Sequence, residues 1–192
     1  MILAESDQVL LRDTAPEDVE AYLRWQTSGE WRYFDAPWEG VIEILSPAQQ
    51  ELFRQRFLEA RQKPLPSPRQ NATIALPDDT PLGWVSRYGT QRFPNVWYIG
   101  IDICEDTYLN RGLGTNALQL WIKYLFAESD IHKMEIHTWT MNPRMAHVAQ
   151  KLGFSEEGTE RELIQWQGEW ISRQRFGLLR QEWEAVNPNI KS

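Results

Sequence analysis

The order of apolar and polar residues predicts seven strands and four helices. Where apolar and polar side chains alternate with a period of two, one face of a strand is buried and the other faces solvent. The last two predicted strands form a hairpin, because Gln167 and Gly168 supply a two-residue turn between them. The predicted strands span residues 8–12, 71–76, 82–89, 96–104, 134–138, 161–166 and 169–179.

Helices are predicted where apolar residues recur every three or four positions behind a capping signal. Thr14–Glu17 and Ser46–Gln49 each have the pattern of a capping box with proline in the first turn. A third helix opens at the glycine pair Gly112 and Gly114 and includes residues 117–125. A fourth runs over residues 142–152. The expected apolar faces of the first three helices are Val19, Tyr22 and Leu23; Leu52, Phe53 and Phe57; and Ala117, Leu118, Trp121, Tyr124 and Leu125.

Strands and helices follow one another in a mixed order, which predicts an α/β domain with a mixed sheet. The 192 residues are enough for one domain with a sizeable core. No apolar run approaches the roughly 18 residues of a membrane helix, and the first residues have no signal-peptide pattern. Cys104 is the single cysteine, so an internal disulfide is excluded. These features favour a cytoplasmic protein without a membrane partner.

Charge is distributed unevenly along the chain. The net charge of −7 argues against nucleic acid as a partner. Residues 1–60 contain 12 Asp and Glu against 5 Lys and Arg, so they carry the whole excess. Two interpretations follow: a solvated acidic face, or a site that attracts a cationic partner.

The segment 99–118 has the pattern of an anion-binding turn. A nearly continuous apolar strand ends in polar residues, and Gly112 and Gly114 then open a helix. Glycines allow backbone amides to approach an anion, and a helix N-terminus favours negative charge. A tight connection without a ligand would have the same pattern. Neither the P-loop nor the three-glycine dinucleotide motif is present.

The segment 142–154 predicts a well-capped helix. Asn142 is a suitable N-cap and Pro143 suits the first helical position, whereas Gly153 ends the helix before Phe154. The expected buried stripe is Met145, Val148, Ala149 and Leu152.

Together, the two segments resemble the GNAT superfamily of acetyltransferases, and most closely its ribosomal-protein and spermidine acetyltransferase branch. The likeness extends from Gln8 to Glu184. It implies a single GNAT domain over 1–192 with a mixed, mostly antiparallel sheet of about seven strands flanked by helices. Within it, the acceptor-side helices would occupy about 14–60, the cofactor-binding core about 96–154 and the C-terminal hairpin about 161–180.

The resemblance implies that acetyl-CoA binds at the first segment. The strand backbone would pair with the pantetheine arm, the turn amides would hold the diphosphate, and Asn142 would contact the cofactor from the next strand's end. The implied cofactor-binding residues are Ile101, Asp102, Ile103, Leu109, Asn110, Arg111, Gly112, Leu113, Gly114, Thr115 and Asn142.

Three positions depart from the family's usual residues. Leu109 stands where the turn usually begins with Gln or Arg. Tyr98 stands where many members have a Glu base, and Ala149 stands where many have a Tyr that protonates the thiolate. The reaction then needs another group to take the proton from the amine. Asp102, on the same strand face as Tyr98, is the principal candidate.

The other candidate residues are weaker. Tyr98 itself is retained as a catalytic candidate, and His132 and His137 rank below Asp102. With three histidines and one cysteine, we expect no metal site.

The resemblance also places the amine acceptor against the N-terminal helices. Five aromatic residues lie within residues 25–38, and aromatic faces hold cations. A cationic acceptor is therefore expected, with the core or a homodimer surface as the alternative role of these aromatics. The candidate acceptor-binding residues are Trp31, Asp35, Trp38, Glu39 and Glu43.

Two functions are compatible with these patterns. One is transfer of acetyl from acetyl-CoA to a primary amine, such as a protein N-terminus or a polyamine, by direct attack in a ternary complex. The other is a catalytically weak domain that holds acetyl-CoA as a sensor.

Overall fold

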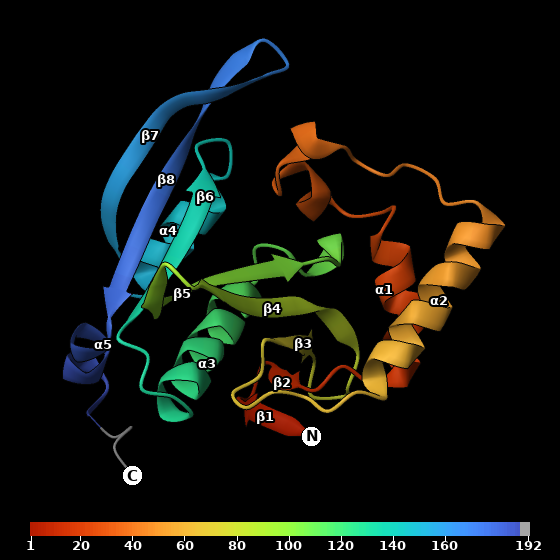
Figure 1. Cartoon of the computed structure of the whole chain (residues 1–192), viewed down its shortest axis with the longest axis horizontal. Helices are drawn as coiled ribbons and strands as arrows, with labels where there is room; N and C mark the ends of the chain where they lie inside the picture. The colour runs from red at the N-terminus through yellow and green to blue at the C-terminus, as the bar shows by residue number, and fades with distance from the viewer. Residues whose placement is uncertain (189–192) are drawn as a thin grey trace.

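A computed structural model describes residues 1–188, which have an α/β fold (Figure 1). The described part contains one mixed sheet of eight strands in the order β1-β2-β3-β4-β5-β6-β8-β7. The strands are β1 Ile2–Glu5, β2 Leu10–Arg12, β3 Asn71–Ala75, β4 Pro81–Thr90, β5 Phe93–Ile103, β6 Lys133–Trp139, β7 Ser155–Trp166 and β8 Glu169–Leu179.

Within residues 1–188, five α-helices flank this sheet, and short 3-10 turns lie between the elements. The helices are α1 Val19–Trp25, α2 Pro47–Arg61, α3 Leu113–Ala127, α4 Pro143–Lys151 and α5 Arg180–Val186. The 3-10 turns are η1 Pro16–Asp18, η2 Glu30–Tyr33, η3 Pro37–Glu39 and η4 Asp106–Tyr108.

The predicted fold class is confirmed, but the sheet has one strand more than expected. The additional strand, β1, pairs antiparallel with β2 at the sheet edge. It has four residues, which are too few to give a clear alternation of apolar and polar side chains. β7 begins at Ser155 rather than at 161, because its polar first half forms a strand by pairing with β8. The short helix α5 was also not predicted.

The two predicted capping boxes had different outcomes. Ser46 and Gln49 cap α2 reciprocally, as expected. The box at Thr14 is wrong: Asp18 accepts the Ala15 N–H at 2.8 Å, and the Thr14 hydroxyl instead bonds to Thr73.

The apolar faces of the helices were predicted better where a helix packs directly on the sheet. Every residue of the predicted α3 face belongs to the core or packs against it. In α2, Phe57 is buried but Leu52 is 44% exposed, because α2 packs on α1 and so lies one layer further out.

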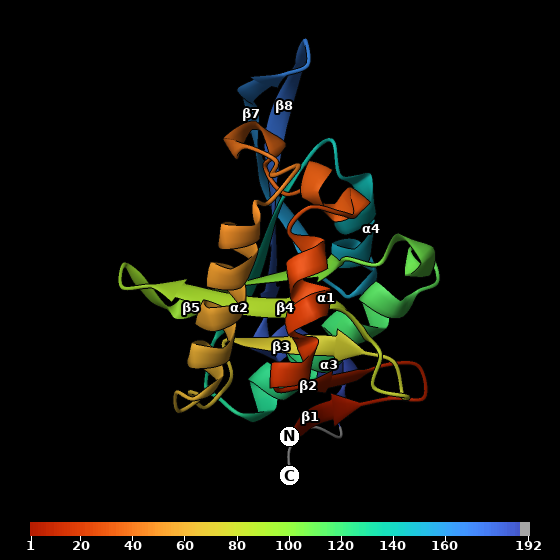
Figure 2. The same cartoon turned by 90° about the vertical axis from the view of Figure 1, so that its right-hand side faces the viewer.

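The helices cover both faces of the sheet. α1 and α2 lie on one face, as Figure 2 shows, and α3 and α4 lie on the other. The side chains of β5 separate accordingly: Ile101 and Ile103 lie against Gly114 of α3, whereas Asp102 is on the face of α1. The β7–β8 hairpin projects beyond the rest of the sheet (Figure 1).

The helices of residues 1–188 include none that is both long and apolar enough to cross a membrane.

Candidate active site

A gap opens in the middle of the sheet between β5 and β6. These neighbouring strands run parallel, and their pairing covers only Val96–Tyr98 against Lys133–Glu135. Beyond Tyr98 the two strands diverge. The Cys104 N–H donates to the Leu82 carbonyl at 2.7 Å, so alternate residues of β5 direct their backbone groups to β4. The N–H and C=O groups of Ile101 and Ile103 are therefore directed into the gap.

The turn that is predicted to bind an anion lies beside this gap. Gly112 has φ = 81°, in the left-handed region, and precedes the first residue of α3. A Cβ placed on Gly112 would meet nothing within 4 Å, and one on Gly114 would come within 3.4 Å of Ile103. The backbone at the start of α3 is therefore open to a ligand, as the sequence predicted.

A cavity of about 400 Å³ connects the turn to the gap. It collects nearly all of the predicted cofactor-binding residues, with Arg111 the exception, and adds side chains of α4 and of the segment before α2. The lining consists of Trp31, Phe34, Ile101, Asp102, Ile103, Tyr108, Leu109, Asn110, Gly112, Leu113, Gly114, Thr115, Asn142, Arg144, Met145, His147, Val148 and Lys151.

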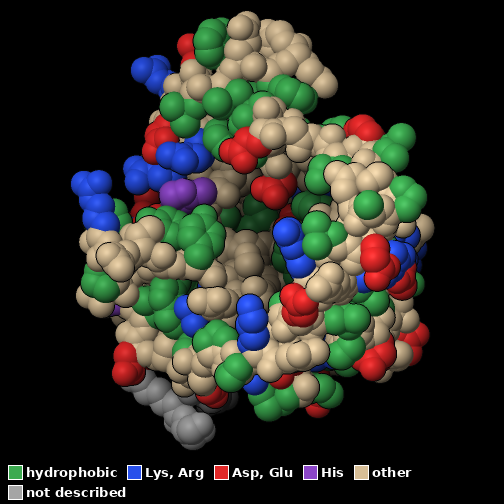
Figure 3. Space-filling model, turned by 45° about the vertical axis from the view of Figure 1, so that its right-hand side comes forward, with side chains coloured by type: hydrophobic (Ala, Val, Ile, Leu, Met, Phe, Trp, Pro, Cys, Tyr) green, Lys and Arg blue, Asp and Glu red, His purple; other side chains and the backbone are tan. Residues whose placement is uncertain are grey.

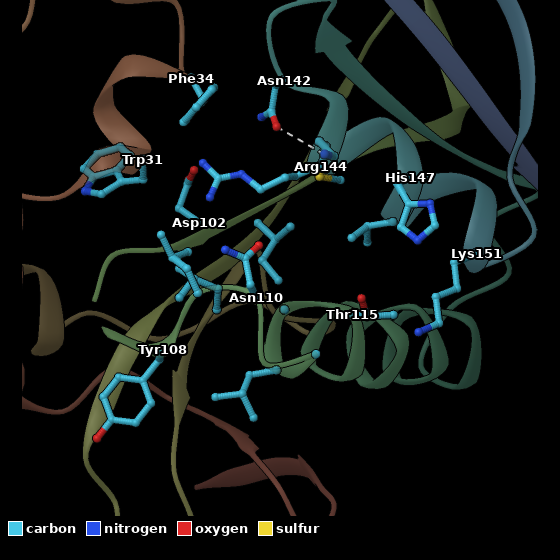
Figure 4. A pocket seen from close by; sticks show the side chains of 18 residues that line it. Trp31, Phe34, Asp102, Tyr108, Asn110, Thr115, Asn142, Arg144, His147 and Lys151 are labelled. Carbon is cyan, nitrogen blue, oxygen red and sulfur yellow. Dashed lines mark hydrogen bonds between the residues drawn. The ribbon is translucent and has the colours of Figure 1, made fainter. Parts of the chain in front are cut away.

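One wall of this cavity is a face of α4 that runs along the whole helix (Figure 4). The Asn142 side chain caps α4 by accepting the Met145 N–H at 3.1 Å, as predicted. Arg144, His147 and Lys151 follow along the helix and line the cavity with basic side chains. Hydrogen-bond donors and positive charge complement the phosphate groups of a ligand.

A second cavity of about 380 Å³ lies on the α1 face of the sheet. The two cavities share the lining residues Trp31, Phe34, Ile101, Asp102, Asn142 and Met145, so they meet at the gap. The remaining lining residues are Asp35, Trp84, Ser86, Tyr88, Ile99, Gly100, Ile136, His137, Thr138 and Trp139. Figure 3 shows a hollowed face of the molecule with acidic side chains on its border.

Asp102 lies where the two cavities meet. Burial raises the pKa of Asp102 to about 7, the charge of Asp35 adds to this rise, and a hydrogen bond from Trp84 opposes it. Burial also raises the pKa of Asp35, with a smaller contribution from Glu39. Asp102 can therefore exchange a proton near neutral pH.

Aromatic rings form much of the second cavity. Trp31 packs edge-on against Trp84 with ring centroids 4.9 Å apart, and Trp84 is stacked with Tyr22 at 5.6 Å. Trp31 and Phe34 belong to residues 29–40, which we call the strap, between α1 and α2. Rigid rings beside two carboxylates give this cavity the chemistry of a cation-binding site.

The predicted acceptor residues are only partly brought together. Trp31 and Asp35 line the second cavity. Trp38 packs edge-on against Trp139, which lines it, at 4.6 Å. Glu39 is close enough to raise the pKa of Asp35. Glu43 instead lines a separate hollow between α1 and α2.

Tyr98 and His137 lie on one side of the second cavity. Tyr98 stacks on Tyr88 at 5.1 Å and contacts the His137 ring edge-on at 5.0 Å. His137 lines the cavity, and its Nε2 is 3.0 Å from the Glu135 carboxylate. Tyr98 is thus placed to support the wall, while His137 reaches the cavity itself.

One of the departures from the family pattern has a structural explanation. Ala149 is fully buried in the main core, so the position holds a packing residue, as its stripe predicted. Leu109 lines the first cavity beside the turn.

Cys104 is buried, and burial raises the pKa of its thiol, which suppresses the thiolate.

Sequence reasoning missed Phe34, Trp84 and Arg144 as cavity residues. Phe34 was noticed only as one of several aromatics, and Trp84 lies in an ordinary strand pattern. Arg144 follows the N-cap of α4, where a basic residue is usually solvated. Each reaches the site through contacts with segments remote in the sequence, so no local signal could identify it.

Among the described residues 1–188, no group of three or more His, Cys, Asp or Glu side chains is arranged to hold a metal ion.

Comparison with known proteins identifies the class that this fold and site define. The family model described as the acetyltransferase (GNAT) domain matches residues 8–155. The chain belongs to this family, whose domain binds acetyl-CoA, and is an acyl-CoA-dependent N-acetyltransferase.

Two relatives from Bacillus subtilis strain 168 were found by sequence. YdaF, named as a ribosomal N-acetyltransferase, is 21% identical over 185 residues, covering 94% of this chain and 96% of its own. YjcK, named as an N-acetyltransferase, is 28% identical over 103 residues. That alignment covers 53% of this chain and 56% of YjcK, so the similarity spans about half of each protein.

Solved structures share the fold. A GNAT acetyltransferase from Bacillus anthracis superposes with a TM-score of 0.72 at 21% identity, covering 95% of this chain and all of the other. Spermidine N-acetyltransferase from Vibrio cholerae, in complex with CoA and spermine, gives 0.70 at 16% identity, covering 93% and 99%. At these identities the likeness establishes the architecture.

Proposed function

We propose that this protein transfers the acetyl group of acetyl-CoA to a cationic primary amine by direct attack in a ternary complex. The observation that carries the proposal is Asp102, an ionisable group located where two adjoining cavities meet. One cavity has the backbone turn and basic wall of a phosphate site, and the other has aromatic rings and carboxylates. The thioester and the amine would meet at Asp102.

The first cavity suits the cofactor. The open backbone at Gly112 and Gly114 would bind the diphosphate, with Arg111 and Thr115 in the same turn. The free backbone groups of Ile101 and Ile103 would pair with the amide-containing arm, which directs the thioester toward Asn142 and the gap. Acetyl-CoA, when bound, supplies an activated acetyl group with a stable leaving thiolate.

The second cavity suits the acceptor. Asp35 and Asp102 attract an ammonium group, and the ring faces of Trp31 and Phe34 hold it by cation–π contact. The aromatic walls also exclude part of the water from the amine. The acceptor of the spermidine N-acetyltransferase relative is a polyamine, which agrees with a cationic acceptor here.

Asp102 would take the proton that the ammonium must lose before it attacks. Its raised pKa keeps it near half-ionised at neutral pH, where a general base works best. Once the proton has passed to Asp102, the amine lone pair would attack the thioester carbonyl, and the C–S bond would break as the C–N bond forms. The thiolate would leave on CoA, and the second nitrogen proton and the proton on Asp102 would pass to water or to the thiolate in the open cavity.

The alternative is a catalytically weak domain that binds acetyl-CoA as a sensor. The two are separated by measuring free thiol released from acetyl-CoA against a panel of primary amines. The proposal predicts saturable release and an acetylated amine for at least one cationic member. Tight acetyl-CoA binding without release for any amine would favour the sensor.

A homodimer stays a prediction; a Vibrio cholerae spermidine N-acetyltransferase is described as dodecameric.

Asp35→Asn is expected to move the pH profile of kcat/KM to lower pH. Loss of the Asp35 charge removes one cause of the raised pKa of Asp102, so the pKa of Asp102 falls. Asp102 is active as a base when deprotonated, and rates therefore rise with pH through its pKa. The acidic limb of the profile, in which the rate rises with pH, is expected near pH 7 in the parent. It should lie at a lower pH in the variant. An unmoved limb would mean that Asp102 is not the group observed.

The acceptor KM is expected to depend on Asp35 and on salt. Asp35→Asn should raise the acceptor KM by roughly tenfold, because a charged contact contributes about 1.5 kcal/mol. Glu43→Gln is the matched control, since Glu43 lines a different hollow. Rising salt should raise the KM of the parent by screening the carboxylates. Equal KM values in both variants, insensitive to salt, would contradict the electrostatic account.

A further inference from the structure

The strap forms the wall shared by the two cavities, yet it has little structure of its own. It consists of the 3-10 turns η2 and η3 and makes no strand pairing. Trp31 and Phe34 from this segment line both cavities. The position of these rings must therefore be set by contacts with other elements.

At the cavity end, the strap is held by elements of the cofactor side. Arg144 Nη2 of α4 donates to Glu30 Oε2 at 2.7 Å. The same guanidinium lies over the Phe34 ring, 4.6 Å from its centroid (Figure 4). The Glu30 N–H donates to Asp106 Oδ1 of η4 at 2.8 Å. One arginine thus contacts the strap on both sides of Trp31.

The far end of the strap is held independently. Trp38 of η3 packs against Trp139 of β6 and lies 6.4 Å from Trp166 of β7 between ring centroids. Arg32 of η2 also contributes, because its Nη1 donates at 2.7 Å to the carbonyl of Ile42, just beyond the strap. Loss of the Arg144 contacts would therefore loosen the Phe34 part of the shared wall, while Trp31 stays packed on Trp84 and Trp38 on Trp139.

We propose that Arg144 is a positioning residue: through Glu30 and Phe34 it sets the wall shared by the cofactor and acceptor cavities, and so couples their occupancy. This inference rests on the proposed function for the identity of the two ligands. A cofactor that packs against α4 and the strap stabilises the wall that the acceptor then uses. By linkage, the acceptor binds more tightly when the cofactor is present.

The expected effect is modest in size. Arg144 and Glu30 are 38% and 53% exposed, so solvent weakens their ion pair. The ring contact adds to it. Together these contacts favour a change of about 3- to 10-fold in the hydrogen-exchange rate of the strap and in the acceptor KM, with little change in the free energy of unfolding.

The test is hydrogen–deuterium exchange of the strap with CoA alone as the probe, in the full chain. In the parent, CoA should slow exchange of the strap, including the Phe34 amide, which donates to the Trp31 carbonyl at 2.9 Å. Glu30→Gln and Arg144→Gln should each speed strap exchange about 3- to 10-fold with CoA bound. The double variant should match Arg144→Gln, because Arg144→Gln already removes the ion pair that Glu30→Gln breaks.

Glu160→Gln is the matched control, since Glu160 pairs with Arg173 at 2.6 Å on the β7–β8 hairpin with similar exposure. Its strap exchange should equal that of the parent.

With the best amine at saturating acetyl-CoA, Glu30→Gln should raise the acceptor KM about 3- to 10-fold and leave kcat within about twofold. A residue needed only for stability would not produce this split.

Calorimetry separates the two levels of failure. If the parent does not bind CoA, the proposed function fails and this inference fails with it. If Glu30→Gln and Arg144→Gln bind CoA but strap exchange and acceptor KM stay at parent values, the positioning role is overturned and the proposed function is untouched.

Discussion

Gly114→Trp is expected to reduce the affinity for acetyl-CoA by about 100-fold or more. An indole at the first turn of α3 would occupy the space where the diphosphate approaches the backbone. Loss of two charge-assisted hydrogen bonds costs about 3 kcal/mol, which corresponds to that factor. The measurement is isothermal titration calorimetry with acetyl-CoA.

A size series at the same position distinguishes obstruction from misfolding. A Cβ on Gly114 would lie 3.4 Å from Ile103, which is an ordinary contact, so Gly114→Ala should fold and bind nearly as the parent does. Affinity should then fall progressively through Gly114→Leu to Gly114→Trp, while the melting temperature changes little. A Gly114→Trp protein that binds acetyl-CoA like the parent would place the cofactor elsewhere.

Asp102→Asn is expected to lower kcat by roughly 100-fold or more, in line with the usual contribution of a general base. Asparagine retains the shape of the side chain but cannot accept the proton. The acidic limb of the pH profile, near pH 7 in the parent, should disappear with it. Initial rates between pH 5 and 9 with the best amine measure both effects.

His137→Gln provides the comparison for that experiment. His137 lines the second cavity alone, whereas Asp102 lines both cavities. We expect this variant to retain the acidic limb. If the limb persists in Asp102→Asn and is lost in His137→Gln, the proton acceptor is the histidine.

The turn before α3 and many residues of the first cavity could be predicted from sequence because their signals are local. A strand, a turn and the first turn of α3 are consecutive in the chain, and the free glycine backbone needs no distant partner. Asn142 similarly caps the helix that it precedes. Ala149 was predicted to be buried from the spacing of its own helix.

The second cavity was less predictable because distant segments build it. Trp84 and Trp31 meet across the α1 face, and Arg144 reaches Glu30, 114 residues away in the chain. Glu43 has the charge expected of a contact to a cationic acceptor, but its side chain lines the separate hollow between α1 and α2. The raised pKa of Asp102 depends on burial and on Asp35, neither of which a strand pattern reveals.

The most direct test of the central claim is an initial-rate study in which acetyl-CoA and the best cationic amine are both varied. Direct attack in a ternary complex requires both ligands in the adjoining cavities before any bond changes, and the buried Cys104 thiol is unsuited to carry the acetyl group. We therefore predict intersecting double-reciprocal lines, with the label of an isotopically marked acetyl group recovered on the amine. Parallel lines, together with label retained on the protein after incubation with acetyl-CoA alone, would contradict the account.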